Sequence, residues 1–296
     1  MDLAQHRVEI LAGTPPGGGQ DRAARALADA LDVEAKIVNV PGRGGGNAWD
    51  ALAIRAGDQH VVSISSPTII TNRELGIAQI DDRDLTVLAH LCLEHLAFVV
   101  SDGGPVADVA DLVEAFAGPG VGVAIATERG NVNHIAVAEV AKSAGVDPAR
   151  VPVRVFDSAR DAIADVLRDG ADVAVVSAAS AIPELESGGV RIVAVTADER
   201  MAPPFDKAPT WVESGVDCAI GTWRGLVGPP AMTDEEIESW DLRIGRAVAG
   251  DPWGDSVQRH HWSSVPLDHL GAGAFLDQQR ETLAQGLRDL GLSRHG

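Results

Sequence analysis

Two glycine- and asparagine-rich segments carry the residue types that bind small anions. The first, TPPGGGQD at residues 14–21, stands between an apolar run, VEILAG, and a helical pattern, RAARALADAL. The N-terminus of a helix offers free backbone N–H groups and the positive end of the helix dipole. Glycine lets a ligand approach those groups without meeting a Cβ. The segment therefore predicts a site for a small anion such as a carboxylate, with a tight turn as the structural alternative.

The same segment does not fit the known nucleotide loops. A Walker loop needs a lysine and a hydroxyl after its last glycine, but Gln20 and Asp21 follow Gly19. The dinucleotide pattern GxGxxG fails because Arg22 stands three residues beyond Gly19, and the later run at residues 42–46 ends at Asn47. No nucleotide cofactor is predicted.

The second segment is TERGNVNH at residues 127–134. It follows the apolar run GVGVAIA and precedes a second helical pattern, IAVAEVAKSAG, so it offers a second set of N–H donors. Two such helix N-termini, facing each other, could hold the opposite ends of a short dianion.

Other reactive residue types lack the spacing that chemistry needs. His260 and His261 are adjacent and cannot share a helix face, and no GxSxG pentapeptide occurs. Cys92 and Cys218 are far apart and match no zinc pattern, which leaves a disulfide or two buried thiols open. The chain has no tyrosine, which argues against a tyrosine-based ferric site. We therefore predict no catalytic residue, no metal and no cofactor.

The elements that must position these segments alternate between strands and helices. Short β-branched runs such as AKIVNV, HVVSIS, VPVRVF, ADVAVVS and VRIVAVT are separated by helical patterns, as in α/β proteins with mostly parallel sheets. Ser158 with Asp161 has the spacing of a capping box, as does Thr233 with Glu236. In the helix after Asp21, a core-facing stripe is expected at Ala24, Leu27, Ala28 and Leu31.

Two breaks in the alternation suggest strands that cross between two lobes. They are LAHLCLEHLAFVVSDGGP and DCAIGTWRGLVGPP. The expected division is residues 1–100 plus 221–296 for the first lobe and residues 101–220 for the second.

The charge of the chain limits its partners. Acidic residues outnumber basic ones 43 to 24 over 296 residues, a formal net charge of −19. Without a basic stripe, nucleic-acid binding is excluded. No apolar stretch reaches the roughly 20 residues that span a bilayer. MDLAQHRVEI shows no signal segment, so we expect either a removed leader or a cytoplasmic location.

Along nearly its whole length the chain resembles the solute-binding proteins of tripartite tricarboxylate transporters, the Bug-type receptors. The resemblance is carried by VEILAGTPPGGGQDRAARALADAL, VNVPGRGGGN, GNVNHIAVAEV, GVRIVAVTADER, APTWVESGV and TWRGLVGPP, in that order. It implies an α/β, two-lobed periplasmic-binding-protein (Venus-flytrap, type II) fold with two crossover strands.

The resemblance also implies the residues that meet the ligand. In the first lobe they are Thr14, Pro16, Gly17, Gly18, Gly19, Asp21, Ser65, Ser66 and Thr68. In the second lobe they are Thr127, Gly130, Asn131, Asn133, His134, Phe156, Ser158, Ser177 and Ser180. Lobe closure would bury the ligand and present a surface to membrane partners.

The chain departs from the family pattern in the second lobe. Glu128 and Arg129 stand where small residues are common, Phe156-Asp157-Ser158 replaces a Tyr-Lys-Gly-like turn, and an acidic residue is missing near Ser177. Arg129 could pair with a distal carboxylate and Glu128 could meet an amine, while solvated loop charges remain the alternative for both. Ligand identity therefore cannot be transferred.

The function we expect is that of an extracytoplasmic, monomeric binding protein without catalytic activity. It would capture a small di- or tricarboxylate, amino acid or aromatic acid and deliver it to membrane transporter subunits. The expected location is the periplasm or cell surface. A ligand-sensing module, inside the cell or in the periplasm, and an enzyme acting on an acidic substrate remain alternatives.

Overall fold

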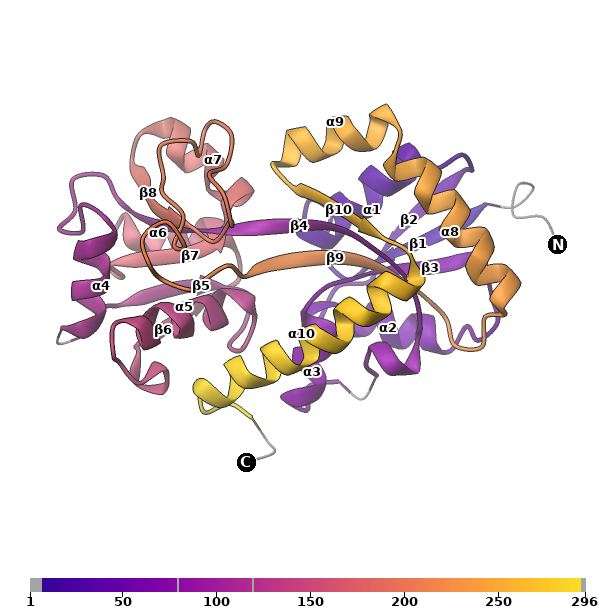
Figure 1. The fold of residues 1–296 in the computed structure, drawn as a ribbon, viewed down its shortest axis with the longest axis horizontal. Coiled ribbons are helices and arrows are strands. Elements are labelled where there is room, and N and C mark those ends of the chain that lie inside the picture. The colour runs from indigo at the N-terminus through magenta and orange to yellow at the C-terminus, as the bar shows by residue number, and fades with distance from the viewer. Residues whose placement is uncertain (1–6, 79, 119, 294–296) are drawn as a thin grey trace. The chain divides into compact units, whose positions relative to one another are not determined.

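The computed structural model describes residues 7–78, 80–118 and 120–293, which divide into two compact units. Unit 1 comprises residues up to Leu93 together with Trp223–Thr282, and unit 2 comprises Glu94–Thr222 together with residues 283–293. The boundaries fall inside three elements, which are labelled in Figure 1: β4 (Thr86–Ser101), β9 (Gly221–Gly228) and α10 (His269–Asp289). The two stretches expected to cross between lobes are thus strands that contain a boundary.

Unit 1 is built on a mixed sheet. Strand β1 (Val8–Ala12) pairs in parallel with β2 (Ala35–Asn39) and β3 (Val61–Ser65), β3 pairs antiparallel with β9, and β10 (Ser263–Leu267) pairs antiparallel with β4. The remaining elements of the unit are α1 (Gly19–Ala30), η2 (Arg43–Gly45), α2 (Gly46–Ala53), α3 (Thr68–Glu74), η3 (Asp82–Asp84), α8 (Asp234–Val248) and α9 (Asp251–His260).

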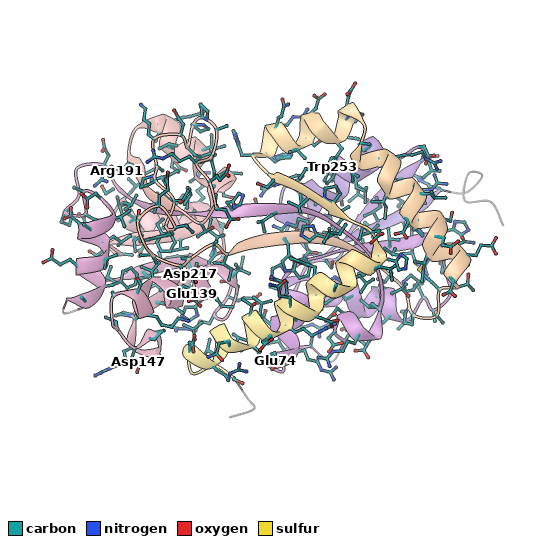
Figure 2. The ribbon with its side chains drawn as sticks, in the orientation of Figure 1. Glu74, Glu139, Asp147, Arg191, Asp217 and Trp253 are labelled. Atoms are coloured by element: carbon teal, nitrogen blue, oxygen red, sulfur yellow. The ribbon has the colours of Figure 1, made fainter. Side chains whose placement is uncertain are left out.

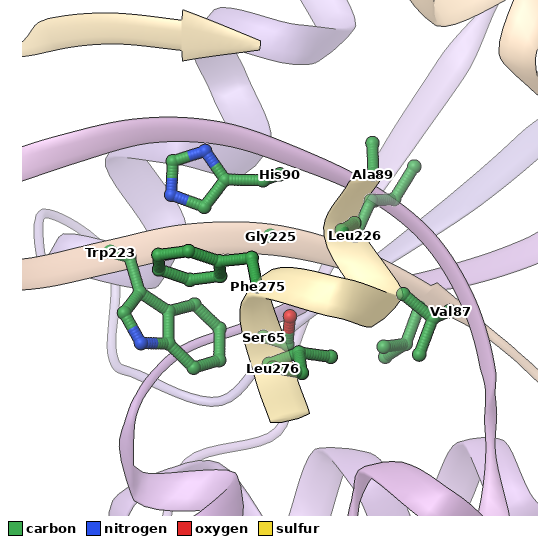
Figure 3. A pocket seen from close by; sticks show the side chains of 11 residues that line it. Ser65, Val87, Ala89, His90, Trp223, Gly225, Leu226, Phe275 and Leu276 are labelled. Carbon is green, nitrogen blue, oxygen red and sulfur yellow. The ribbon is translucent and has the colours of Figure 1, made fainter. Parts of the chain in front are cut away.

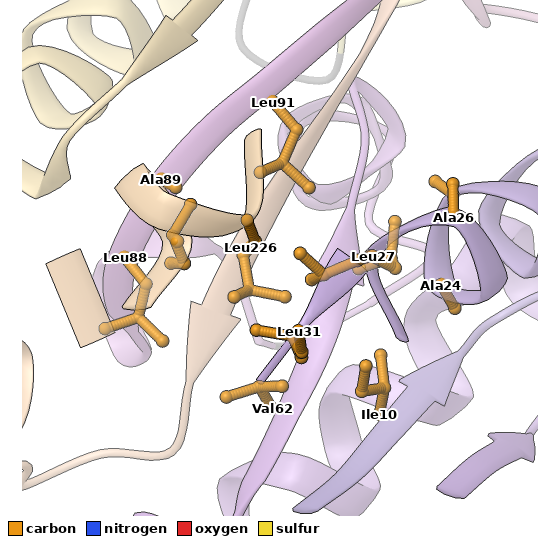
Figure 4. Close-up of a cluster of buried hydrophobic side chains, with 14 of the residues drawn as sticks. Ile10, Ala24, Ala26, Leu27, Leu31, Val62, Leu88, Ala89, Leu91 and Leu226 are labelled. Carbon is orange, nitrogen blue, oxygen red and sulfur yellow. The ribbon is translucent and has the colours of Figure 1, made fainter. Parts of the chain in front are cut away.

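Helix α1 forms where the sequence predicts it because its apolar stripe can be buried. Ala24 and Leu27 are fully buried and Leu31 nearly so (Figure 4). Ala28 is partly buried and packs against the same cluster. The helix packs against α8 and α9, and Trp253 of α9 completes this core (Figure 2). The expected stripe is confirmed, and it fixes the N-terminus of α1 at the edge of the sheet.

Unit 2 repeats this plan around a second sheet. Strand β5 (Val123–Ala126) pairs in parallel with β6 (Val153–Phe156) and β7 (Val173–Ser177), and β4 pairs antiparallel with β7 and β8 (Val190–Val195). The other elements are α4 (Val109–Ala117), α5 (Val132–Ser143), η4 (Pro148–Arg150), α6 (Ala159–Val166) and α7 (Ala178–Ser187).

The C-terminal part of α10 lies in a different unit from the one that the sequence predicts. Residues 283–293 belong to unit 2, although the sequence placed all of 221–296 in the first lobe. The physical reason is packing on α5. A Cβ at Gly286 would lie 2.6 Å from Cγ2 of Ile135, and Lys142 Nζ donates to Asp289 Oδ2 over 2.7 Å. A continuous helix gives no sequence signal for such a change of partner.

Local signals in the sequence match the structure. Ser158 accepts a hydrogen bond from the backbone N–H of Asp161 as the N-cap of α6, and Thr233 forms a full capping box with Glu236. Cys92 and Cys218 are both buried thiols that are not joined in a disulfide, so the disulfide alternative is wrong. Within the described ranges, no helix has both the length and the apolar character needed to cross a bilayer.

Candidate functional site

In unit 1 the predicted residues gather where β1, β2 and β3 end. These strands are parallel, so the loops that follow them share one edge of the sheet, the usual ligand edge of α/β folds. Gln20 joins the loops: its Oε1 accepts from the N–H of Gly13 at 2.8 Å, and its Nε2 donates to Gly44 O at 3.3 Å and Ser66 Oγ at 3.2 Å. Thr68 Oγ1 lies 2.8 Å from Ser66 Oγ and donates to Gly44 O at 2.6 Å. Ser66 and Thr68 therefore help hold the edge together.

Asp21 is the buried anchor of the first glycine loop. Its carboxylate accepts from Gly17 N at 2.8 Å, from Asn39 Nδ2 at 2.8 Å and twice from the Arg25 guanidinium, while its own N–H donates to Thr14 Oγ1 at 3.1 Å. Burial alone would raise the pKa of Asp21, but the bonds from Arg25, Gly17 and Asn39 outweigh burial and lower it. Asp21 and Thr14 thus shape the loop, and an ionised Asp21 would itself repel a carboxylate.

The first turn of α1 retains open donors. In the part of the chain that the structure describes, the backbone N–H groups of Gly19 and Gln20 donate to no hydrogen-bond acceptor. Gly18 N–H bonds to Pro15 O at 3.0 Å, and Pro16 and Gly17 are exposed at the tip, where Gly17 has a φ of +83°.

Arg224 is the functional candidate that sequence reasoning missed. It lies in β9, is only 7% exposed, and its guanidinium packs against Gly19: a Cβ at Gly19 would lie 3.0 Å from Arg224 Cζ. The Arg224 guanidinium therefore occupies the space that a side chain at Gly19 would take. The sequence feature that points to Arg224 is a charged residue inside the largely apolar run TWRGLVG.

Ser65 has a different setting from Ser66. It lines a small cavity of about 10 Å³ with His90, Trp223 and Phe275 (Figure 3). That volume holds about one water molecule, so a dicarboxylate cannot enter it. The Phe275 and Trp223 rings pack in a T-shaped arrangement with 5.8 Å between centroids, which supports a packing role for Trp223.

In unit 2 the second loop follows β5 and is fixed by Asn131. The Asn131 side chain donates to Ala126 O at 2.8 Å and Thr127 Oγ1 at 2.9 Å, and it caps α5 by accepting from His134 N at 3.1 Å. Thr127 holds a φ of +72°, a left-handed conformation that is costly for a β-branched residue. Such strain is often found at ligand sites.

His134 is held neutral inside this loop. The N–H of Gly130 donates to His134 Nδ1 at 3.1 Å, so the neutral ring carries its proton on Nε2. Burial, with a contribution from the charge of Arg129, lowers the pKa of His134 to about 4. The Asn133 side chain donates from Nδ2 to Val175 O at 3.0 Å. Among the described residues, the backbone N–H groups of Val132 and Asn133 meet no hydrogen-bond acceptor. The start of α5 therefore offers donors, as the start of α1 does.

The two charged residues of the loop have different surroundings. Arg129 is exposed, and its Nη2 donates to Val153 O at 2.6 Å. Glu128 is half-buried; its Oε1 is fully buried, and the described structure offers it no hydrogen-bond partner. Burial raises the pKa of Glu128.

The other predicted residues of unit 2 lie at the ends of β6 and β7, which share an edge with β5. Phe156 ends β6 and is half-buried beside the Arg154 guanidinium, 5.6 Å from its ring centroid. Ser158 is engaged as the N-cap of α6 and also donates to Asp161 Oδ2 at 2.6 Å. Ser177 and Ser180 bond to each other at 2.7 Å at the start of α7. The structure therefore collects each set of predicted residues at one sheet edge of its own unit.

Among residues 7–78, 80–118 and 120–293, no three His, Cys, Asp or Glu side chains come together to hold an ion.

Comparison with known proteins agrees with this architecture. Residues 20–241 match the family model described as "Tripartite tricarboxylate transporter family receptor" (TctC). The chain is 25% identical over 252 residues to the "UPF0065 protein in tcbD-tcbE intergenic region" of Pseudomonas sp. (strain P51), covering 79% of this chain and 71% of that protein.

Two solved structures share the fold. One is an R. palustris protein with adipate, with a TM-score of 0.84 at 19% identity, covering 99% of both chains. The other is MatC from Rhodopseudomonas palustris with bound malate, with a TM-score of 0.75 at 20% identity, covering 97% of this chain and 99% of that one. The fold is therefore the two-lobed, Venus-flytrap architecture of periplasmic binding proteins, and the chain belongs to the tripartite tricarboxylate transporter receptor family, TctC.

Proposed function

We propose that this protein is an extracytoplasmic receptor that binds a small carboxylate, performs no chemistry on it and delivers it to the membrane subunits of a tripartite tricarboxylate-type transporter. The family match supports the receptor role, and the fold neighbours that hold malate and adipate support a carboxylate ligand. We place the receptor in the periplasm, as a monomer.

The observation that carries the proposal is the position of Arg224. A nearly buried guanidinium packs on Gly19, in the same turn where Gly19 and Gln20 present open N–H groups. A carboxylate binds well to such a combination, because a guanidinium and helix N-terminal amides both stabilise negative charge. Asp21, the nearby acid, has its charge balanced by Arg25 and by two neutral donors.

The test is calorimetric titration of Arg224→Gln with malate and adipate. Charge-assisted bonds contribute about 1.5–3 kcal/mol, so we expect affinity to fall at least about tenfold. Arg224→Lys keeps the charge but loses the planar fork, so it should recover part of the loss.

Arg243→Gln is the matched control. Arg243 is similarly buried in the same unit, but it pairs with Asp32 and lies outside the loop. It should leave affinity unchanged. If Arg224→Gln folds and binds malate or adipate as tightly as the wild type, Arg224 does not contribute to the binding site.

A further inference from the structure

The side chain of Gln20 connects the first glycine loop of unit 1 to the two loops beside it. Gln20 is only 2% exposed, so its amide is enclosed by the protein. Its Oε1 accepts from Gly13 N at 2.8 Å, and Gly13 and Gln20 directly flank the loop at residues 14–19. Its Nε2 donates to Gly44 O at 3.3 Å and to Ser66 Oγ at 3.2 Å, in the loops that follow β2 and β3. One side chain thus joins all three loops.

The partners of Gln20 fix the orientation of its amide. The N–H of Gly13 can only donate and the carbonyl of Gly44 can only accept, so Oε1 must face the first and Nε2 the second. Nε2 carries two hydrogens, and Gly44 and Ser66 take one each. The amide is therefore fully used in holding the loops, and it does not serve as a ligand donor.

The glycine run at residues 42–46 supplies the surface on which this amide rests. A Cβ at Gly13 would clash with Cα of Gly45, and a Cβ at Gly45 would lie 2.6 Å from Gln20 Nε2. Gly45 also has a φ of +112°, which an L side chain rarely adopts. The run that matches no nucleotide pattern thus lets the backbone of its loop pack directly on the start of the first loop.

This arrangement bears on binding because Gln20 also presents one of the open donors. Among the described residues, the backbone N–H groups of Gly19 and Gln20 have no acceptor, and the Arg224 guanidinium packs against Gly19. Groups that bind a ligand must be held to within about 0.5 Å of the productive geometry. The Gln20 side chain ties the first turn of α1 to the start of its own loop and to both neighbouring loops.

We propose that Gln20 is a positioning residue for the bound carboxylate, which sets the first-turn N–H groups of α1 through its buried side chain. The inference rests on the proposed carboxylate-binding function and names the residue that holds its donors in place. It also gives the glycine run at residues 42–46 a role in binding, as the support for the Gln20 amide.

Gln20→Met keeps the length of the side chain and removes its hydrogen bonds. By calorimetric titration, we expect affinity for the acid that the wild type binds best among succinate, malate and adipate to fall at least about tenfold. Gln20→Asn keeps an amide that is one carbon too short to reach all three partners, so affinity should fall at least about fivefold. Circular dichroism shows whether each variant is folded at the temperature of the titration, and Gln20→Asn decides the test if Gln20→Met does not fold.

Trp240→Phe is the matched control. Trp240 is fully buried in the same unit, and its Nε1 donates to Gln59 O at 3.2 Å, so this substitution also removes a hydrogen bond of a buried side chain. Gln59 precedes β3 and Ser66 follows it, so the two residues lie at opposite ends of that strand. A loss of stability alone does not change the affinity of a protein that stays folded. Trp240→Phe should therefore lower the melting temperature and leave affinity within about threefold.

The possible failures can be told apart. If a folded Gln20 variant binds within about threefold of the wild type, Gln20 is not a positioning residue, while the carboxylate receptor stands. If Trp240→Phe weakens binding as much as Gln20→Met, the effect is general destabilisation, which also contradicts the proposal. If neither Gln20 variant folds, the side chain is needed for the fold itself and the proposal is wrong. If the wild type binds none of the three acids, the proposed function itself fails.

Discussion

At the scale of single residues, His134 shows how a neutral imidazole holds the geometry of the second loop. Its Nδ1 accepts from Gly130 N, and burial keeps the ring neutral. A charged imidazolium would lose that bond, because a protonated Nδ1 cannot accept from an N–H. The loop geometry therefore depends on the neutral form.

This dependence gives a pH prediction for stability. The folded pKa of His134 is about 4 against an ordinary value of 6.5, so the unfolded chain binds more protons between those values. The free energy of unfolding should therefore be unaffected by His134 above pH 6.5 and should fall as pH drops from 6.5 to 4, by at most about 3 kcal/mol.

The comparison with His134→Asn isolates this effect. Asparagine offers an oxygen acceptor to Gly130 but does not titrate, so its urea-unfolding free energy should vary less between pH 6.5 and 4. Glu128, whose raised pKa acts in the opposite direction, is common to both proteins. Parallel curves for wild type and variant would show that His134 is not held neutral.

Sequence reasoning located these loops but could not assign their residues to ligand or support. Glycines before a helix indicate donors, and Thr14, Asp21 and Asn131 fit that pattern. Their side chains are engaged in holding the loops, which only the contacts show. Arg224 was missed because its approach to Gly19 joins residues about 200 positions apart.

At the scale of elements, helices α5 and α6 of unit 2 each begin at a residue whose side chain caps the first turn. The N-cap of α5, Asn131, also ties the loop to β5 through two donated bonds, whereas the N-cap of α6, Ser158, serves its own helix. The two caps therefore differ in what they hold.

Removing each cap should measure that difference. Ser158→Ala should cost about 1 kcal/mol, the usual value for a lost N-cap. Asn131→Ala should cost about 2–3 kcal/mol, since it also removes the donors to Ala126 O and Thr127 Oγ1. Urea unfolding followed by circular dichroism gives both values, and both caps belong to unit 2. Equal losses would mean that the Asn131 tethers do not contribute.

Elements were the most predictable level of this structure. The β-branched runs, the caps of α6 and α8 and the stripe of α1 are local signals that tertiary packing reinforces. The change of unit within α10 was not predictable. It depends on the fit of Gly286 against Ile135, and no local propensity encodes that fit.

At the scale of the whole molecule, the formal net charge of −19 opposes the capture of an anion. This electrostatic repulsion acts over long distances, and salt screens it beyond a Debye length of about 8 Å at physiological ionic strength. In the proposed site, Arg224 and the N–H groups at the start of α1 would meet a carboxylate at hydrogen-bond distance, where screening is weak. A carboxylate receptor with an acidic surface is therefore physically consistent.

The central claim, that this protein binds a small carboxylate, is tested most directly by calorimetric titration of the wild type at physiological ionic strength. The panel is succinate, malate and adipate, with their uncharged diamides and a neutral sugar as controls. We predict saturable one-to-one binding of at least one acid and no binding of its diamide. Saturable binding of the sugar or of a diamide, with no heat from any acid, would contradict the account.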